Sequence, residues 1–115
     1  MKSLGDIERV RGAVSDLLGS QYFAVLCTRS ETHPYCSLVG FAATEDLRRI
    51  VLATMKDTRK FRNLSSDGRV SLMIDSRTNK VEDLSEASAV TVLGEVGGVE
   101  SAEESPHREL YLQRH

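Results

Sequence analysis

A short polar cluster in the middle of the chain has the composition of a phosphate-binding site. Thr54 and Thr58 stand four residues apart, and Arg59 and Lys60 follow directly after Thr58. Hydroxyl donors, two cations and the free backbone N–H groups at the start of a helix are what a phosphate dianion requires. The same residues also suit a solvated helix face with Asp57 as its N-terminal cap, so the cluster alone leaves both interpretations open.

Two cysteines and a histidine form the other group with reactive or metal-binding side chains. Cys27, His33 and Cys36 match none of the known zinc spacings, and no fourth ligand is apparent, so we predict no metal site. If residues 30–33 form a hairpin loop, Cys27 lies opposite Cys36 at about 4.5 to 5.5 Å, which is compatible with a disulfide. We expect two free thiols, because two cysteines suit a reducing compartment, and a thiol titration distinguishes the two states.

Motifs of the common hydrolases and kinases are absent from the sequence. The patterns G-x-S-x-G, H-E-x-x-H and the Walker motif do not occur. The sequence therefore assigns no catalytic residue, and whether the protein is an enzyme stays open.

The elements that must position these side chains follow from the hydrophobic periodicity. Apolar residues at three- and four-residue steps predict a helix over residues 4–18, in which Ser3 and Asp6 form a capping box and Gly19 ends the helix. A short helix is predicted over residues 57–68, one helical turn within 76–87, and a further helix after Pro106.

Runs rich in β-formers fill most of the remaining chain. They predict antiparallel strands over residues 22–29, 34–43, 48–54, 69–75 and 87–96. Several of these runs are apolar on both alternating faces, which favours a closed barrel with a helix packed outside it.

Length and charge restrict the class of protein. The chain has 115 residues and six aromatic residues, which fits one domain over residues 1–115. A net charge of -2 lacks the basic excess that nucleic-acid binding requires. No apolar run approaches the ~20 residues of a membrane span, and the N-terminus does not have the pattern of a secretory signal, so we expect a cytoplasmic protein.

A longer stretch around the polar cluster resembles a known family. The segment LATMKDTRKFRNLSSDGRVSLMID, together with PYCSLVGFAA and ASAVTVLGEV, is similar to the pyridoxamine 5'-phosphate oxidase-like, FMN-binding split-barrel family. The resemblance implies an antiparallel split barrel of six or slightly fewer strands. It also implies that Thr54, Thr58, Arg59 and Lys60 bind the phosphate of FMN.

The same resemblance implies where the flavin ring lies. In the family the ring follows the second strand, so Ser37, Leu38 and Val39 are the expected neighbours, through backbone groups and side chains. Asn63 is expected to hold the corner between strand and helix rather than a ligand. The founding oxidases carry an arginine and a lysine on that strand, and this sequence has neither, which argues against their activity.

The resemblance further implies a homodimer with the cofactor at the subunit interface, acting on an unidentified small molecule in an FMN-dependent oxidation or reduction. Haem is an alternative ligand, because the pattern K-F-R-N-L followed by R-V-S-L-M-I-D is similar to the haem-degrading branch. A deazaflavin in place of FMN, a non-enzymatic flavin- or haem-binding protein, and a homologue without cofactor are further alternatives. Family members usually continue past the segment YLQRH, so residues 100–115, an acidic tail and the start of a helix, are expected to end a short member.

Overall fold

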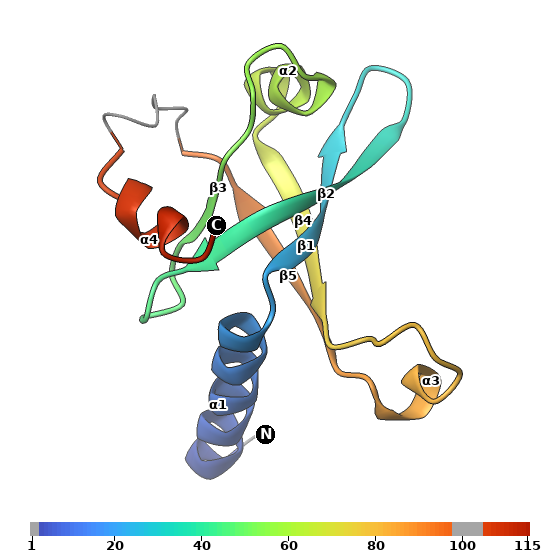
Figure 1. Cartoon of the computed structure of the whole chain (residues 1–115), viewed down its shortest axis with the longest axis vertical. Coiled ribbons are helices and arrows are strands. Elements are labelled where there is room, and N and C mark those ends of the chain that lie inside the picture. The colour runs from blue at the N-terminus through green and yellow to red at the C-terminus, as the bar shows by residue number, and fades with distance from the viewer. Residues whose placement is uncertain (1–2, 98–104) are drawn as a thin grey trace.

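A five-stranded antiparallel sheet forms the centre of the protein, of which the computed structural model describes residues 3–97 and 105–115. Its strands are β1 (Phe23–Arg29), β2 (Pro34–Ala43), β3 (Ile50–Leu52), β4 (Arg69–Asp75) and β5 (Ala89–Glu95). They lie in the order β3-β2-β1-β4-β5, and helices flank the sheet (Figure 1). The predicted mainly β architecture with flanking helices is confirmed, at the smaller of the predicted strand numbers.

The predicted split-barrel fold is confirmed as a curled five-stranded sheet, but this sheet does not close into a full barrel within the described residues. The strand order ends at β3 on one side and at β5 on the other, and no pairing joins these two strands in the described chain. Residues 48–54 were predicted as one strand, but only Ile50–Leu52 pair, with Phe41, Ala42 and Ala43 of β2. Apolar residues on both faces of a strand therefore do not reflect closure here, because Phe23 and Leu38 on the outer face are 58% and 68% exposed.

Four described helices surround the sheet: α1 (Leu4–Ser20), α2 (Arg59–Ser66), α3 (Asp83–Glu86) and α4 (Arg108–Leu112). The capping box of Ser3 and Asp6 at the start of α1 is confirmed. Gly19 does not end this helix, which continues to Ser20 and is followed by Gln21 in extended conformation. Among the described helices, none combines the length and the apolar character that crossing a membrane requires.

The two shortest helices, α3 and α4, follow the sequence prediction, and α2 is shorter than the predicted helix over residues 57–68. One turn, α3, forms within residues 76–87, and α4 begins shortly after Pro106, as predicted. Most of the predicted acidic tail falls in residues 98–104, which lie outside the described residues. The C-terminal residues of the described chain return to α1, since the Arg114 guanidinium donates to the Leu18 carbonyl oxygen over 2.9 Å.

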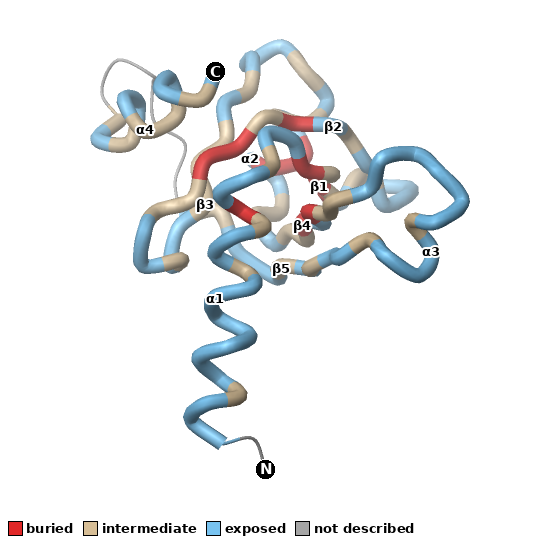
Figure 2. Tube along the Cα trace, turned by 60° about the horizontal axis from the view of Figure 1, so that its bottom comes forward, coloured by how far each residue is buried: buried red, intermediate tan, exposed pale blue. Residues whose placement is uncertain are grey.

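The core lies under the inner face of β1, β2 and β4, where the buried residues gather (Figure 2). Alternation along the strands points every second residue inward. The buried cluster consists of Leu18, Ala24, Leu26, Val39, Phe41, Leu72 and Ile74. Most of α1 projects away from this core, and only its C-terminal end contributes a buried residue (Figure 2).

An ion pair fixes the C-terminal end of α2 to the sheet. Asp67, the first residue after this helix, accepts hydrogen bonds from Arg69 Nε at 3.0 Å and Nη2 at 2.8 Å, and Arg29 of β1 lies 3.8 Å away. The hydrogen bond from Arg69 is the main cause that lowers the pKa of Asp67 from 3.8 to about 2.

The lowered pKa of Asp67 predicts a pH dependence of stability. A carboxyl group whose pKa is lower in the folded chain stabilises it above the unfolded pKa, and this contribution is lost as the pH falls from about 4 to about 2. Urea unfolding of wild type and Asp67→Asn should therefore show a difference in free energy that narrows between about pH 5 and about pH 2.5. A difference that stays constant over this range would contradict the assignment.

Candidate functional site

Two threonine hydroxyls meet where β3 leads into α2. Thr54 follows β3 by two residues, Thr58 directly precedes α2, and their Oγ1 atoms lie 3.2 Å apart. The Thr58 hydroxyl donates to the Met55 carbonyl oxygen at 2.7 Å and accepts from the Phe61 N–H at 3.2 Å. Thr58 is therefore the N-cap of α2, and the prediction that Asp57 caps this helix is wrong. A Ser or Thr oxygen one residue before the first turn reaches the third N–H, which Asp57 is one residue too early to do.

These bonds divide the roles of the two threonines. A hydroxyl has one proton and two lone pairs, and the contacts of Thr58 use its proton and at least one lone pair. Thr54 makes only a long contact of 3.4 Å to the Met55 carbonyl oxygen besides its contact with Thr58. Because the Thr58 proton goes to Met55, Thr54 is the donor in the contact between the two hydroxyls, and its proton reaches a ligand only when that contact is exchanged for the ligand. Thr58 chiefly holds the helix N-terminus in place.

Positive charge gathers at the same helix end. Arg59 and Lys60 occupy the first two positions of α2, and neither forms an ion pair within the described residues. Their backbone N–H groups belong to the first turn, which has no partners inside the helix. The Arg59 guanidinium lies 5.6 Å from the ring centre of Tyr35 on β2. Two cations and first-turn N–H donors thus gather where no described acid pairs with them, which favours an anion.

A buried hydrogen bond joins this helix to the sheet. The Asn63 side chain of α2, 7% exposed, donates to the Thr28 hydroxyl of β1 at 3.0 Å. Thr28 in turn donates to the Tyr35 carbonyl oxygen over 3.4 Å. The prediction of a structural role for Asn63 is confirmed, because its buried side chain joins α2 to β1.

The three predicted ring-binding residues of β2 have different environments. Ser37 faces inward, and its Oγ is the one buried side-chain oxygen or nitrogen of the described residues that has no hydrogen-bond partner. The side chain of Leu38 faces outward, and that of Val39 belongs to the core cluster. A buried hydroxyl without a partner is costly, and Ser37 is the residue of the three whose side chain lacks a hydrogen-bond partner among the described residues.

The backbone N–H and C=O groups of β2 also alternate, between the neighbouring strand β1 and the other edge of β2. Phe41 N donates to the Tyr22 carbonyl oxygen, and in an antiparallel pair every second residue bonds to the same neighbour. The backbone groups of Ser37 and Val39 therefore point toward β1. Those of Cys36 and Leu38 then point to the other edge, which β3 covers only from Phe41 onward. Leu38 can therefore offer backbone donors and acceptors along this edge.

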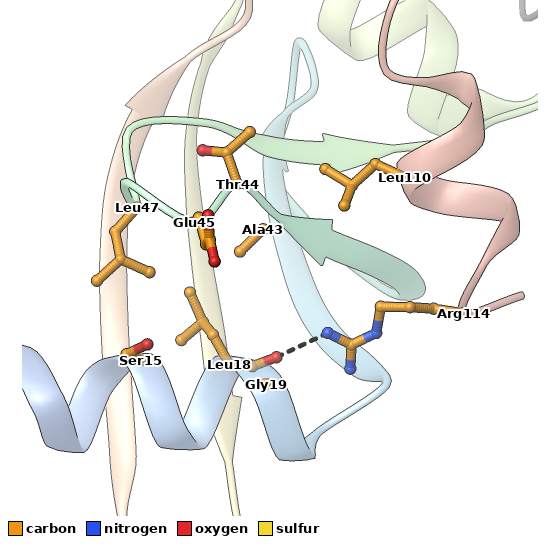
Figure 3. Close-up of a pocket in the computed structure, with 9 residues that line it drawn as sticks. All are labelled: Ser15, Leu18, Gly19, Ala43, Thr44, Glu45, Leu47, Leu110 and Arg114. Carbon is orange, nitrogen blue, oxygen red and sulfur yellow. Dashed lines mark hydrogen bonds between the residues drawn. The ribbon is translucent and has the colours of Figure 1, made fainter.

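Concave surfaces lie elsewhere on the described chain. One of about 360 Å³ opens between the end of α1, the β2–β3 turn and α4, where Arg114 reaches the Leu18 carbonyl (Figure 3). A second of about 620 Å³ lies beside the β1–β2 hairpin and β4. Neither includes Thr54, Lys60 or Ser37 in its lining, and within the polar cluster Arg59 is exposed while Thr54, Thr58 and Lys60 are half-buried.

Metal-binding and acid–base groups do not gather in the described residues. No group of three His, Cys, Asp or Glu side chains is placed there to hold a metal ion. His115 Nε2 lies 3.0 Å from the Phe41 carbonyl oxygen and its ring packs beside Tyr111. No described side chain is thereby marked as a catalytic acid or base.

Tyr35 is the site residue that the sequence analysis missed. It shares the inward face of β2 with Ser37, two residues along the strand, and Arg59 stacks on it. The sequence contained a signal for this residue: side chains two residues apart on a strand point to the same face, so Tyr35 shares the face of Ser37.

Solved structures share this arrangement of elements. A haem-binding protein from Mycobacterium smegmatis is 24% identical, with a TM-score of 0.73 over 88% of this chain and 41% of that protein. A conserved hypothetical protein from Mycobacterium tuberculosis is 21% identical, with a TM-score of 0.67 over 90% of this chain and 62% of its own. A third structure, 21% identical, reaches a TM-score of 0.75 over 93% of this chain and 70% of its own. The chain thus spans about two fifths of the haem-binding protein.

Sequence comparison covers almost the whole chain. No curated protein matches it. The family pattern described as pyridoxamine 5'-phosphate oxidase matches residues 10–114, which include every strand, the polar cluster before α2 and the described C-terminal helix. The chain therefore belongs to the pyridoxamine 5'-phosphate oxidase-like family of split-barrel proteins.

Proposed function

We propose that this protein binds FMN and works as a flavoprotein, with the FMN phosphate held at the N-terminus of α2. The observation that carries the proposal is the charge of Arg59 and Lys60, unpaired among the described residues, beside the Thr54 hydroxyl and the first-turn N–H groups. A phosphate dianion accepts hydrogen bonds from all of these groups, and charge-assisted bonds of this kind are about twice as strong as neutral ones.

The free edge of β2 supplies a second argument for a ligand. The backbone groups of Leu38 point to the edge that β3 leaves uncovered before Phe41, and Tyr35 on the same strand stacks against Arg59. A flavin bound from the phosphate site toward this strand meets the free backbone edge of Leu38. FMN, when bound, supplies the redox chemistry, and the chain's residues bind and orient it.

We further propose that two copies of the chain form the cofactor site. Neither concave surface described above contains the polar cluster, so a second copy placed against it covers a bound flavin. An apolar stripe on α1, formed by Leu4, Ile7 and Val10, is exposed in the single chain, and a partner subunit can bury it. The proposed location is the cytoplasm, and the proposed activity is an oxidation or reduction of a small molecule.

Haem is the second candidate ligand, because a haem-binding protein is among the structural neighbours. The polar cluster favours FMN over haem, since it concentrates two cations and hydroxyl donors at one point, as a phosphate dianion requires. A deazaflavin that carries a phosphate meets the same cluster. Bound haem and bound flavin are distinguished by their absorption.

An absorption spectrum tests these proposals directly. Protein incubated with FMN and freed of excess ligand should retain the flavin bands in a 1:1 ratio to the chain, and light scattering should report twice the 12.7 kDa of one chain. Addition of a reduced nicotinamide cofactor then tests for turnover, because reduction bleaches the flavin bands. A Soret band after incubation with haem, without flavin retention, would select the haem alternative, and a colourless protein would overturn both.

A further inference from the structure

The two cysteines face each other at the middle of the β1–β2 hairpin. Cys27 and Cys36 are direct cross-strand partners, as the sequence predicted, and both are free thiols. Their Sγ atoms lie 3.2 Å apart. Because Arg29 pairs with Pro34, which has no N–H, the ladder alternation makes Cys27 and Cys36 a non-hydrogen-bonded pair, in which the Cα atoms are closest, at about 4.5 Å. This separation lies within the range that a disulfide requires.

Both sulfur atoms are accessible from the outer face of the sheet. Cys36 is exposed, and Cys27, half-buried, lines the surface groove of about 620 Å³ together with Ser71 and Leu93. Since the two side chains point away from the buried cluster, a bond between them does not disturb core packing. Within the described residues no third ligand joins the pair, so its chemistry is that of a dithiol rather than of a metal site.

We propose that Cys27 and Cys36 form a reversible dithiol–disulfide site that exchanges with low-molecular-weight disulfides of the glutathione class. The Cys36 thiolate attacks one sulfur of the small disulfide, which forms a mixed disulfide and releases one small thiol. The Cys27 sulfur then attacks the Cys36 sulfur, the intramolecular bond forms, and the second small thiol leaves. Two protein thiols are oxidised, one disulfide is reduced to two thiols, and the protons of the cysteines end on the released thiols.

The surroundings of the two sulfurs support this order. The hydrogen bond with Cys36, followed by burial, raises the pKa of Cys27 above its ordinary value of 9.0. Cys27 thus keeps its proton to higher pH, while Cys36 is the sulfur that a solvent-borne disulfide reaches first. Once a mixed disulfide forms on Cys36, Cys27 is already at contact distance, and its attack is intramolecular. Such transient disulfides are also the kind found in reducing compartments.

Mass spectrometry of the full chain tests the proposal. Fully reduced protein, freed of reductant, is incubated with excess glutathione disulfide, quenched in acid and measured intact, with and without bound FMN. Wild type should lose two hydrogens in mass and both titratable thiols, without a lasting glutathione adduct, and reduced glutathione should restore both thiols.

Two matched variants separate the steps. Cys27→Ser should accumulate a single glutathione adduct on Cys36, because the resolving sulfur is absent. Cys36→Ser should acquire its adduct more slowly, because Cys27 is less exposed. A wild type that carries two stable adducts, forms disulfide-linked dimers, or keeps both thiols free while Cys27→Ser is modified would overturn the proposal. The result does not depend on FMN, so it stands apart from the proposed cofactor function.

Discussion

Replacement of Lys60 by alanine is expected to weaken FMN binding by roughly 1.5 to 3 kcal/mol, or about 10- to 150-fold in Kd. This is the range for loss of a hydrogen bond to a charged group. Lys60 is at the second position of α2 and forms no ion pair with the described residues, so its charge is available to the phosphate. Titration of flavin fluorescence or absorption with each protein measures the change.

The matched control for this variant is Lys80→Ala in the loop before α3, which lies at the other end of β4 from α2 (Figure 1). Lys80 is exposed and forms no ion pair with the described residues. Its removal changes net charge by the same amount and should alter the Kd by less than about threefold, because screening weakens distant surface charges. Thr58→Ala is a poorer probe, since it also removes the cap of α2. Equal effects of Lys60→Ala and Lys80→Ala, or none from Lys60→Ala, would contradict the phosphate assignment.

Replacement of Phe41 by alanine should reduce the free energy of unfolding by about 3 to 5 kcal/mol. The Phe41 side chain is 0% exposed, is the largest fully buried side chain of the described residues and sits in β2 opposite Leu52 of β3. Its truncation leaves a cavity where β2, β3 and the end of α1 meet. Total stabilities of domains are typically about 5 to 15 kcal/mol, so the thermal midpoint should fall on the order of 10 to 25 °C.

Phe23→Ala supplies the control for this experiment. Phe23 has the same side chain in the neighbouring strand, but it points to the outer face and is 58% exposed. Its truncation is expected to cost about 1 kcal/mol or less. Urea unfolding of the three proteins gives the comparison. If the two variants lost the same stability, the inner and outer faces of the sheet would be assigned wrongly.

Local features of the chain were predictable from sequence because they depend on neighbours along it. The capping box of Ser3 and Asp6 involves residues three apart, and the facing of Cys27 and Cys36 follows from the length of one hairpin loop. Errors of one residue arose where two local signals competed. Asp57 and Thr58 are both favourable N-cap residues. Thr58 is the N-cap because the loop before α2 places its hydroxyl within hydrogen-bond distance of the Phe61 N–H.

Features that depend on distant pairing were not predictable in the same way. Ser37, Leu38 and Val39 are consecutive, and their side chains alternate between the two faces of β2, but which face is buried depends on the packing of α1, β1 and β4. The length of β3 likewise depends on how many residues of β2 it meets. Tyr35 joins the site because α2 packs over that part of the sheet, where Asn63 is hydrogen-bonded to Thr28.

The sequence by itself determined the family pattern, the order of helices and strands, and the group of hydroxyls and cations at residues 54–60. These properties depend on residue types and on spacings of a few residues, because steric and hydrogen-bonding preferences between near neighbours determine helices, strands and turns. The tertiary structure decided that Thr54 and Thr58 touch and that, among the described residues, Arg59 and Lys60 stay without acidic partners and the Ser37 hydroxyl is buried without a hydrogen bond. Each of these depends on segments brought together by packing, which no spacing along the chain specifies.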